Sequence, residues 1–291
     1  MLAIGCETEP EPQSGDAGDG SAGESDDGAG SSGPTGSGDG EPQGCDAVPE
    51  DMACIESGTY WMGCNPEDPY CYILEDEIDL RADERPFHEV RLDAFLIDLF
   101  EVDVTAYAEC VDAGACTEPY AEVNGELCTW GVTGQEDYPA NCVTWDQARE
   151  YCEWRGRRLP TEAEWAAATR GESARLYSWG NSDPTCDTTV MWSCAEGHPL
   201  PVGSAPDGAT PEGVQDLIGN VCEWTADWYS EDYYSVSPVD NPTGPASGTE
   251  RSVRGPAFRT NSADALEASR RGGNPPDSSA DTRGFRCAAT P

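Results

Sequence analysis

The sequence predicts an α+β fold in which short helices and strands are joined by much irregular coil and cross-linked by disulfides. Two central segments carry helix signals, and short apolar segments typical of strands lie on both sides of them. The 32 Gly and 23 Pro residues place turns along the whole chain, so regular structure should be sparse. Fourteen Cys residues, with no Cys-x-x-Cys spacing and only two His residues, favour disulfides over zinc sites.

The expected strands lie at both ends of the folded part. Residues 58–63 have the composition of a short strand, and residues 88–102 should be extended because apolar and charged residues alternate at their start. A short helix is expected at residues 105–111. The last third of the chain should be mostly loop, with short strands at residues 252–254 and 284–288.

The two central helices have the clearest start and stop signals. Thr144 is the expected N-cap of a helix over residues 145–154. Thr161 and Glu164 make a capping box at the start of the second helix, which Gly171 should end. Three residues of the first helix are spaced i, i+3 and i+7 and therefore share one face: Trp145, Ala148 and Cys152.

The charge of the chain excludes several classes of partner. There are 56 acidic and 16 basic side chains, which gives a formal net charge of −40. Such a surface repels nucleic-acid phosphates and anionic lipid headgroups, so neither nucleic acid nor membrane binding through a basic patch is expected. Divalent cations are the favoured counter-charge. No apolar run approaches the roughly 20 residues that a membrane-spanning helix needs.

Composition divides the chain into three parts. Residues 1–6, Met-Leu-Ala-Ile-Gly-Cys, resemble the end of a bacterial lipoprotein signal peptide in which Cys6 accepts the lipid, although Ala3 stands where Leu is expected. Residues 7–50 are expected to form a disordered, acidic, Gly/Ser/Pro-rich linker, and residues 51–291 the folded domain. We therefore expect a monomeric, membrane-anchored lipoprotein outside the cytoplasm, in the periplasm or at the cell surface. An ordinary Cys at the start of the chain is the alternative.

Several blocks of the folded part carry a family resemblance. The most specific are Arg158-Leu159-Pro160-Thr161-Glu162-Ala163-Glu164-Trp165, Gly219-Asn220-Val221-Cys222-Glu223-Trp224 and Gly284-Phe285-Arg286-Cys287. Together with further blocks that occur in the same order, they resemble the sulfatase-modifying factor family, whose best-known members are formylglycine-generating enzymes. The resemblance runs from about Gly58 to Ala288 and implies a C-type-lectin-like α+β fold.

The resemblance also implies where the family chemistry would occur. Formylglycine-generating enzymes oxidise the Cys of a Cys-x-Pro-x-Arg motif in sulfatases with O₂ and copper(I), and two Cys thiolates hold the copper. Copper(I) is a soft ion that requires such ligands. The matching positions here are Thr260 and, with a one-residue slip, Ala265. Two nearby positions also depart from the family pattern, namely Ala257 and Cys222. Copper and the oxidase activity are therefore not expected, and the domain is expected to be a pseudoenzyme.

A structural calcium site is the part of the family pattern that this sequence retains. The resemblance places its ligands at the side chains of Asp216 and Glu223 and at the backbone carbonyls of Gly219 and Val221. These are hard oxygen donors of the kind that calcium prefers. A salt-bridged turn is the alternative interpretation.

The disulfide pattern is expected partly from the resemblance and partly from proximity in the sequence. The family disulfide between the first central helix and the last strand matches Cys152 and Cys287. Cys222 would remain free. Five further pairs are expected between neighbouring Cys residues: Cys45–Cys54, Cys64–Cys71, Cys110–Cys116, Cys128–Cys142 and Cys186–Cys194.

The functional hypothesis is a binding module for a protein, peptide or glycan. Its groove would be formed by loops at residues 227–234 and 257–271 and lined by aromatic side chains suited to stacking on sugars or peptides. The lining residues would be Trp228, Tyr229, Tyr233, Tyr234 and Arg259. Packing of the rings beneath long loops is the alternative for the cluster. A divergent formylglycine-generating oxidoreductase is the alternative for the whole domain.

Overall fold

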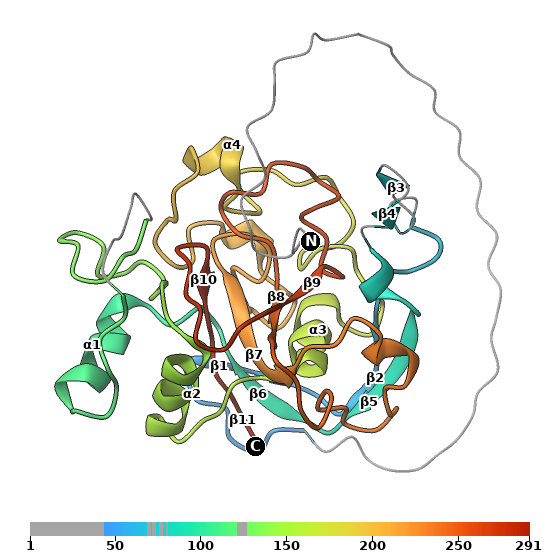
Figure 1. The fold of residues 1–291 in the computed structure, drawn as a ribbon, viewed down its shortest axis with the longest axis horizontal. Coiled ribbons are helices and arrows are strands. Elements are labelled where there is room, and N and C mark those ends of the chain that lie inside the picture. The colour runs from blue at the N-terminus through green and yellow to red at the C-terminus, as the bar shows by residue number, and fades with distance from the viewer. Residues whose placement is uncertain (1–43, 69–70, 72–73, 76–77, 80, 121–126) are drawn as a thin grey trace, which may run out of the picture.

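The computed structural model describes residues 44–68, 71, 74–75, 78–79, 81–120 and 127–291. Figure 1 shows small sheets and short helices connected by long loops, so the prediction of an α+β class with much coil is confirmed. Cys6 and nearly all of the expected linker lie outside the described residues. No helix in the described part of the chain has the length and apolar character needed to cross a bilayer.

The sheets bring distant parts of the chain together. In a three-stranded antiparallel sheet, β6 (Phe95–Asp98) lies between β1 (Met52–Ile55) and β11 (Ala288–Ala289), so strands near the two ends of the described chain belong to one sheet. A four-stranded sheet has the order β10 (Arg283–Gly284), β7 (Cys222–Trp228), β8 (Arg251–Arg254) and β9 (Arg271–Asn274). Two antiparallel pairs complete the strands: β2 (Gly58–Met62) with β5 (His88–Leu92), and β3 (Leu74–Glu75) with β4 (Ile78–Asp79).

The central helices begin where their caps predict. Helices α2 (Trp145–Trp154) and α3 (Glu162–Arg170) start after Thr144 and Thr161, and each cap forms a complete capping box. Gly171, at the end of α3, has a φ of 59°. The other helices are α1 (Val104–Asp112), α4 (Trp192–Ala195) and three 3₁₀ turns at Ala82–Glu84, Pro206–Gly208 and Tyr233–Ser235.

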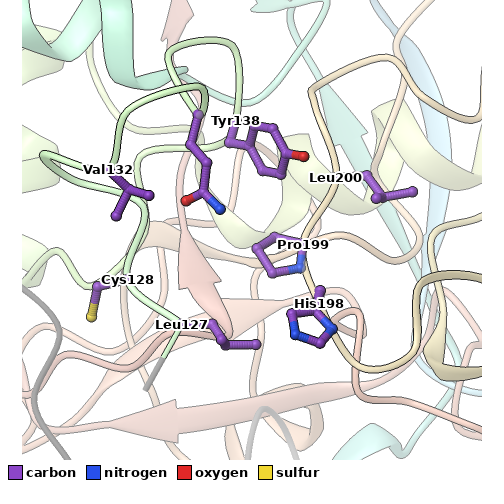
Figure 2. A pocket seen from close by; sticks show the side chains of 8 residues that line it. Leu127, Cys128, Val132, Tyr138, His198, Pro199 and Leu200 are labelled. Carbon is purple, nitrogen blue, oxygen red and sulfur yellow. The ribbon is translucent and has the colours of Figure 1, made fainter. Parts of the chain in front are cut away.

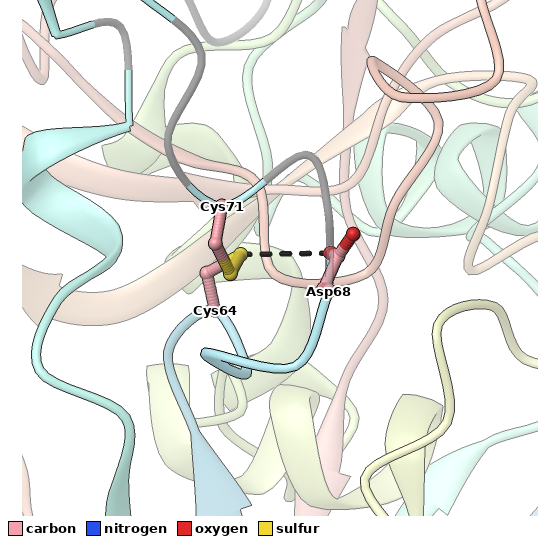
Figure 3. A group of neighbouring side chains, drawn as sticks. All are labelled: Cys64, Asp68 and Cys71. Atoms are coloured by element: carbon pink, nitrogen blue, oxygen red, sulfur yellow. Dashed lines mark hydrogen bonds between the residues drawn. A yellow bond between two sulfur atoms is a disulfide. The ribbon is translucent and has the colours of Figure 1, made fainter.

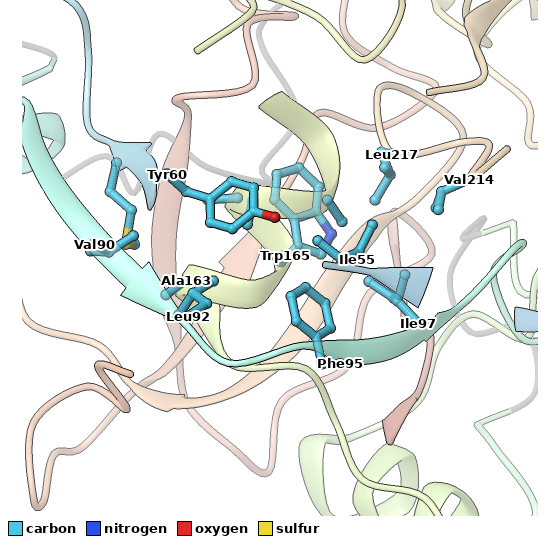
Figure 4. Packing of buried hydrophobic residues seen from close by; sticks show 14 of the residues in the cluster. Ile55, Tyr60, Val90, Leu92, Phe95, Ile97, Ala163, Trp165, Val214 and Leu217 are labelled. Carbon is cyan, nitrogen blue, oxygen red and sulfur yellow. The ribbon is translucent and has the colours of Figure 1, made fainter. Parts of the chain in front are cut away.

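The main hydrophobic core lies between α3 and the strands β1, β2, β5 and β6. Figure 4 shows Trp165 of α3 among Tyr60, Phe95 and Ile97, and each of these side chains is buried. A second core packs α1 and α2 against β7, where Trp224 is fully buried. Burial of these large apolar side chains is the main source of stability in a fold with little regular structure.

Six disulfides link described residues, and all six are the expected pairs. Cys152–Cys287 ties α2 to the chain just before β11 across a sequence separation of 135 residues. The five local pairs form as expected from proximity. The expectation that Cys222 is a free thiol is wrong, because Cys222 is disulfide-bonded, and no cysteine in the described part is free. This pattern is typical of a protein that folds in an oxidising compartment.

Candidate functional site

The loop after β8 holds the positions that match the copper ligands of the family. Thr260 and Ala265 are half-buried in it. The backbone N–H of Thr260 donates to the carbonyl of Ala257 at 2.9 Å, and its own carbonyl accepts from the N–H of Trp192 at 2.9 Å. A threonine hydroxyl and an alanine methyl cannot replace two thiolates as ligands of copper(I).

The loop before β7 has an unusual backbone conformation. Asp216, Gly219 and Asn220 have φ values of 60°, 98° and 54°, all in the left-handed region. A Cβ atom on Gly219 would lie 2.3 Å from Oγ1 of Thr189, so only glycine fits there. No described residue donates a hydrogen bond to the carbonyl oxygens of Gly219 or Val221. With respect to the described residues, both oxygens are therefore open to a ligand.

Three buried carboxylates surround this loop. Asp216 accepts a hydrogen bond from the N–H of Gly203 at 2.6 Å, and burial raises its pKa to about 6. Glu223 accepts from Arg286 at 2.7 Å and from the indole N–H of Trp165 at 2.8 Å.

The third carboxylate, Glu101, was not predicted from the sequence. It accepts from the side-chain amide of Asn220 at 2.6 Å and from the N–H of Val221 at 3.0 Å. Burial, together with the charges of Asp216 and Glu223, raises its pKa well above the usual range. Its only sequence signal is its position in the block Glu101-Val102-Asp103-Val104-Thr105, which shares the family resemblance.

The donor chemistry of this loop fits a calcium ion. Asp216 and Glu223 supply carboxylate oxygens, and Gly219 and Val221 supply carbonyl oxygens without another described partner. Among the described groups, Arg286 is the cation whose charge acts on all three carboxylates. The cluster therefore carries an excess of buried negative charge, which a divalent cation would neutralise.

A second group of potential ligand residues does not make a thiolate metal site. Figure 3 shows Cys64, Cys71 and Asp68 side by side, with Oδ2 of Asp68 3.6 Å from Sγ of Cys64. The two sulfur atoms are joined in a disulfide, so neither is available as a thiolate.

The aromatic residues expected to line a groove make internal contacts. Tyr234 is buried, donates its hydroxyl to Glu162 at 2.9 Å, and has the guanidinium of Arg271 4.2 Å from its ring centre. Tyr229 also faces Arg271, at 4.7 Å, and donates to Asp83 at 2.8 Å. The structure thus brings these two rings together around one guanidinium.

The remaining residues of that expected groove have other partners. Arg251 is stacked between the rings of Trp228 and Trp145, with its guanidinium 3.6 Å from each ring centre. Tyr233 is partly buried and packs against the main core. Arg259 forms an ion pair with Asp281 and makes no described contact with the other four.

Glu162 is the centre of a compensated ion network. Its carboxylate accepts from Arg271 at 2.7 Å and 3.0 Å and from Arg254 at 3.0 Å. Burial alone would raise its pKa, but the two guanidiniums and the hydroxyl of Tyr234 lower it to about 2. A carboxylate with so low a pKa stays ionised, so Glu162 serves as a structural anion rather than as an acid–base group.

The comparisons with known proteins agree with the sequence blocks. Residues 40–291 match the model of the sulfatase-modifying factor enzyme 1-like domain. A formylglycine-generating enzyme of Streptomyces coelicolor is 36% identical over 54% of this chain and 54% of its own length. A formylglycine-generating enzyme of Bos taurus is 30% identical over 85% of this chain and 77% of its own length.

Two further comparisons bear on activity and fold. An inactive C-alpha-formylglycine-generating enzyme 2 of Bos taurus is 35% identical over 55% of this chain and 52% of its own length. The matched segment thus spans about half of that relative and of the Streptomyces protein. The solved structure of PvdO from Pseudomonas aeruginosa covers 82% of this chain and 94% of its own, with a TM-score of 0.68 and 23% identity, which shows a shared fold.

Proposed function

The chain belongs to the sulfatase-modifying factor family, and from this premise we propose that its domain is an extracytoplasmic binding module without the family's copper-dependent cysteine oxidase activity. Its partner is a protein, a peptide or a glycan. The six disulfides between described residues support a location outside the cytoplasm.

One observation carries the loss of oxidase activity: the chain has no pair of free thiols. Thirteen of the fourteen Cys residues are described, and all thirteen are disulfide-bonded. At most one thiol then remains for a copper(I) site that needs two. The family contains a member named as inactive that is 35% identical to this chain, which supports the same interpretation.

Calcium is the metal that this proposal includes. Asp216, Glu223 and the carbonyls of Gly219 and Val221 would hold it, and its role would be structural. Asn220, within the same loop, hydrogen-bonds to Glu101 and to the N–H of Leu200 at 3.1 Å. A bound ion would therefore stabilise both the loop that binds it and the neighbouring loop that contains Leu200.

An activity assay tests the proposed loss of oxidase chemistry. The disulfide-intact protein would be incubated with copper(I), O₂ and a Cys-x-Pro-x-Arg peptide, with an active formylglycine-generating enzyme as the positive control, and the peptide mass followed by mass spectrometry. We expect no product and less than one equivalent of bound copper. Formylglycine in the peptide would overturn the proposal in favour of a divergent oxidoreductase.

A further inference from the structure

A small pocket lies between two loops, at a place that the expected aromatic groove does not include. One wall comes from residues 127–138 and the other from residues 198–200 (Figure 2). The pocket has a volume of about 330 Å³. Its walls are mainly apolar and are formed by Leu127, Cys128, Val132, Pro199 and Leu200.

The first wall is held in place by buried polar groups. The side-chain amide of Asn141 donates to the carbonyl of Leu127 at 2.8 Å, and its oxygen accepts from the N–H of Thr129 at 2.8 Å. The N–H of Leu127 donates to Asp281 at 2.8 Å. The disulfide Cys128–Cys142 adds a covalent tie to the same wall.

The second wall is fixed independently. Asn220, fully buried, accepts the N–H of Leu200 at 3.1 Å, and the N–H of Val202 donates to the carbonyl of Asp137 at 2.9 Å. The latter bond links the two loops directly. Because both walls are fixed by the fold, a ligand would not have to order the pocket on binding.

Three polar side chains project from the walls. The hydroxyl of Tyr138 and the side-chain amide of Gln135 make no described hydrogen bond, and Nδ1 of His198 lies 3.0 Å from the carbonyl oxygen of Glu196. Apolar walls with a few hydrogen-bonding groups are typical of a site that receives one side chain or small ring and fixes its orientation.

The loops that form the pocket carry exposed apolar and acidic residues. Val132 has an exposed fraction of 39%, and Trp192 has one of 45%, while the Trp192 ring lies against Gly197, the residue before His198. Exposed large apolar side chains beside a pocket are typical of protein–protein contact sites. Glu136, Asp137 and Glu196 are exposed on the same loops. Neither residues 127–138 nor residues 192–200 contain an Arg or a Lys.

We propose that this pocket receives one aromatic or branched apolar side chain of a cationic peptide segment, and that the exposed acidic residues of the two loops bind the basic residues on either side of it. The inference rests on the proposed binding function and names its partner class. The net charge of −40 favours a cationic partner over a neutral one through long-range attraction.

The test uses the full chain with its disulfides intact and a fluorescein-labelled Arg-Gly-Trp-Gly-Arg peptide. Fluorescence anisotropy would give its Kd beside those of Arg-Gly-Ala-Gly-Arg and Glu-Gly-Trp-Gly-Glu. We expect the Trp-to-Ala and the Arg-to-Glu changes each to weaken binding about tenfold or more, as loss of an anchoring side chain or of charge complementarity does.

A matched pair of variants locates the site. Val132→Arg places a cation at the mouth of the pocket and should weaken binding of the Trp peptide about tenfold or more. Val236→Arg makes the same change at a valine whose exposed fraction is 74% and which lies outside the pocket lining. This control variant should bind the Trp peptide with a Kd within about twofold of the wild-type value, because it alters only the total charge.

Four outcomes would overturn the inference: no binding of the Trp peptide, equal binding of the Ala peptide, equal weakening by both valine variants, or displacement of the peptide by a neutral oligosaccharide. The last would assign the pocket to a glycan. The oxidase assay is a separate measurement, and none of these four outcomes predicts formylglycine in it. Failure of this inference can therefore be told apart from failure of the proposed loss of oxidase activity.

Discussion

Two buried ion clusters contact the same tryptophan and differ in how their carboxylates are paired with cations. Glu223 accepts from the indole N–H of Trp165, and Arg254, which binds Glu162, lies over the Trp165 ring at 5.1 Å. Around Glu162, Arg254 and Arg271 donate to one carboxylate, whose pKa is about 2, and the buried carboxylates of Asp83 and Asp227 lie in the field of the same Arg271. Around Glu223, three carboxylates share Arg286.

This difference separates a carboxylate that accepts hydrogen bonds directly from two cations from two carboxylates that accept none from a cation among the described residues. A buried charge is tolerated when it is paired and hydrogen-bonded, and it is costly when it is not. Glu162 has its own cations, because Arg254 and Arg271 both donate to its carboxylate. In the cluster of Glu101, Asp216 and Glu223, burial is the main cause of the raised pKa of Glu101 and of Asp216, and neither carboxylate accepts a hydrogen bond from a cationic side chain in the described part of the chain.

The largest expected effect comes from removing the charge of Glu162 from its ion network. Glu162→Gln leaves Arg254 and Arg271 buried without their counter-charge, so the free energy of unfolding should fall by about 3–5 kcal/mol. Urea unfolding measures this change in the free energy of unfolding. Glu153→Gln is the control, because Glu153 pairs with Arg149 at 2.8 Å on an exposed helix face, and its loss should cost at most about 0.5 kcal/mol. Similar effects of the two variants would contradict the assigned role of Glu162.

Acid should weaken the same cluster. The folded pKa of Glu162, about 2, is below its ordinary value of 4.5. Its contribution is therefore complete above pH 4.5 and is lost as the pH falls toward 2, and the full shift corresponds to about 3 kcal/mol. Unfolding midpoints measured between pH 2 and 5 should fall less steeply in Glu162→Gln than in the wild type. Parallel pH profiles of the two proteins would contradict this prediction.

Calcium should stabilise the second cluster. At a free concentration of one hundred times its Kd, a ligand that binds only the folded state adds about 2.7 kcal/mol to the free energy of unfolding. Thermal unfolding with calcium and with a chelator measures the difference. Glu162→Gln should keep the full calcium response, because its cluster lacks the proposed ligands. An equal melting temperature with calcium and with the chelator would contradict the proposed calcium site.

Features that depend on neighbouring residues were predictable from the sequence. Thr144 and Thr161 start α2 and α3 because a capping box needs residues only three positions apart. The five local disulfides form because short loops bring their Cys residues together. Cys152–Cys287 spans 135 residues, and family resemblance rather than proximity predicted it.

Features that arise only on folding could not be predicted. Strand β7 is buried on both faces over most of its length and therefore lacks the alternating pattern of a half-buried strand. Strand β9 contains Gly273, where a Cβ atom would lie 2.3 Å from the Tyr229 ring, so glycine is present for close packing rather than for a turn. The pocket depends on Asn141 and Asn220, which position two distant loops.

The smallest expected effect, that of Asp216→Asn, is the sharpest test of the comparison between the two clusters, because calcium should change it. Asp216→Asn keeps the size of the side chain and its tolerance of a left-handed φ but removes one buried negative charge. In chelator the variant should be more stable than the wild type by about 1–2 kcal/mol, since the uncompensated repulsion falls. With calcium it should gain less stability than the wild type, since one charged ligand is lost. Chemical unfolding in both conditions gives the two differences. A variant that is less stable than the wild type in chelator would mean that Asp216 is already balanced by the protein, and the charge excess would then be absent.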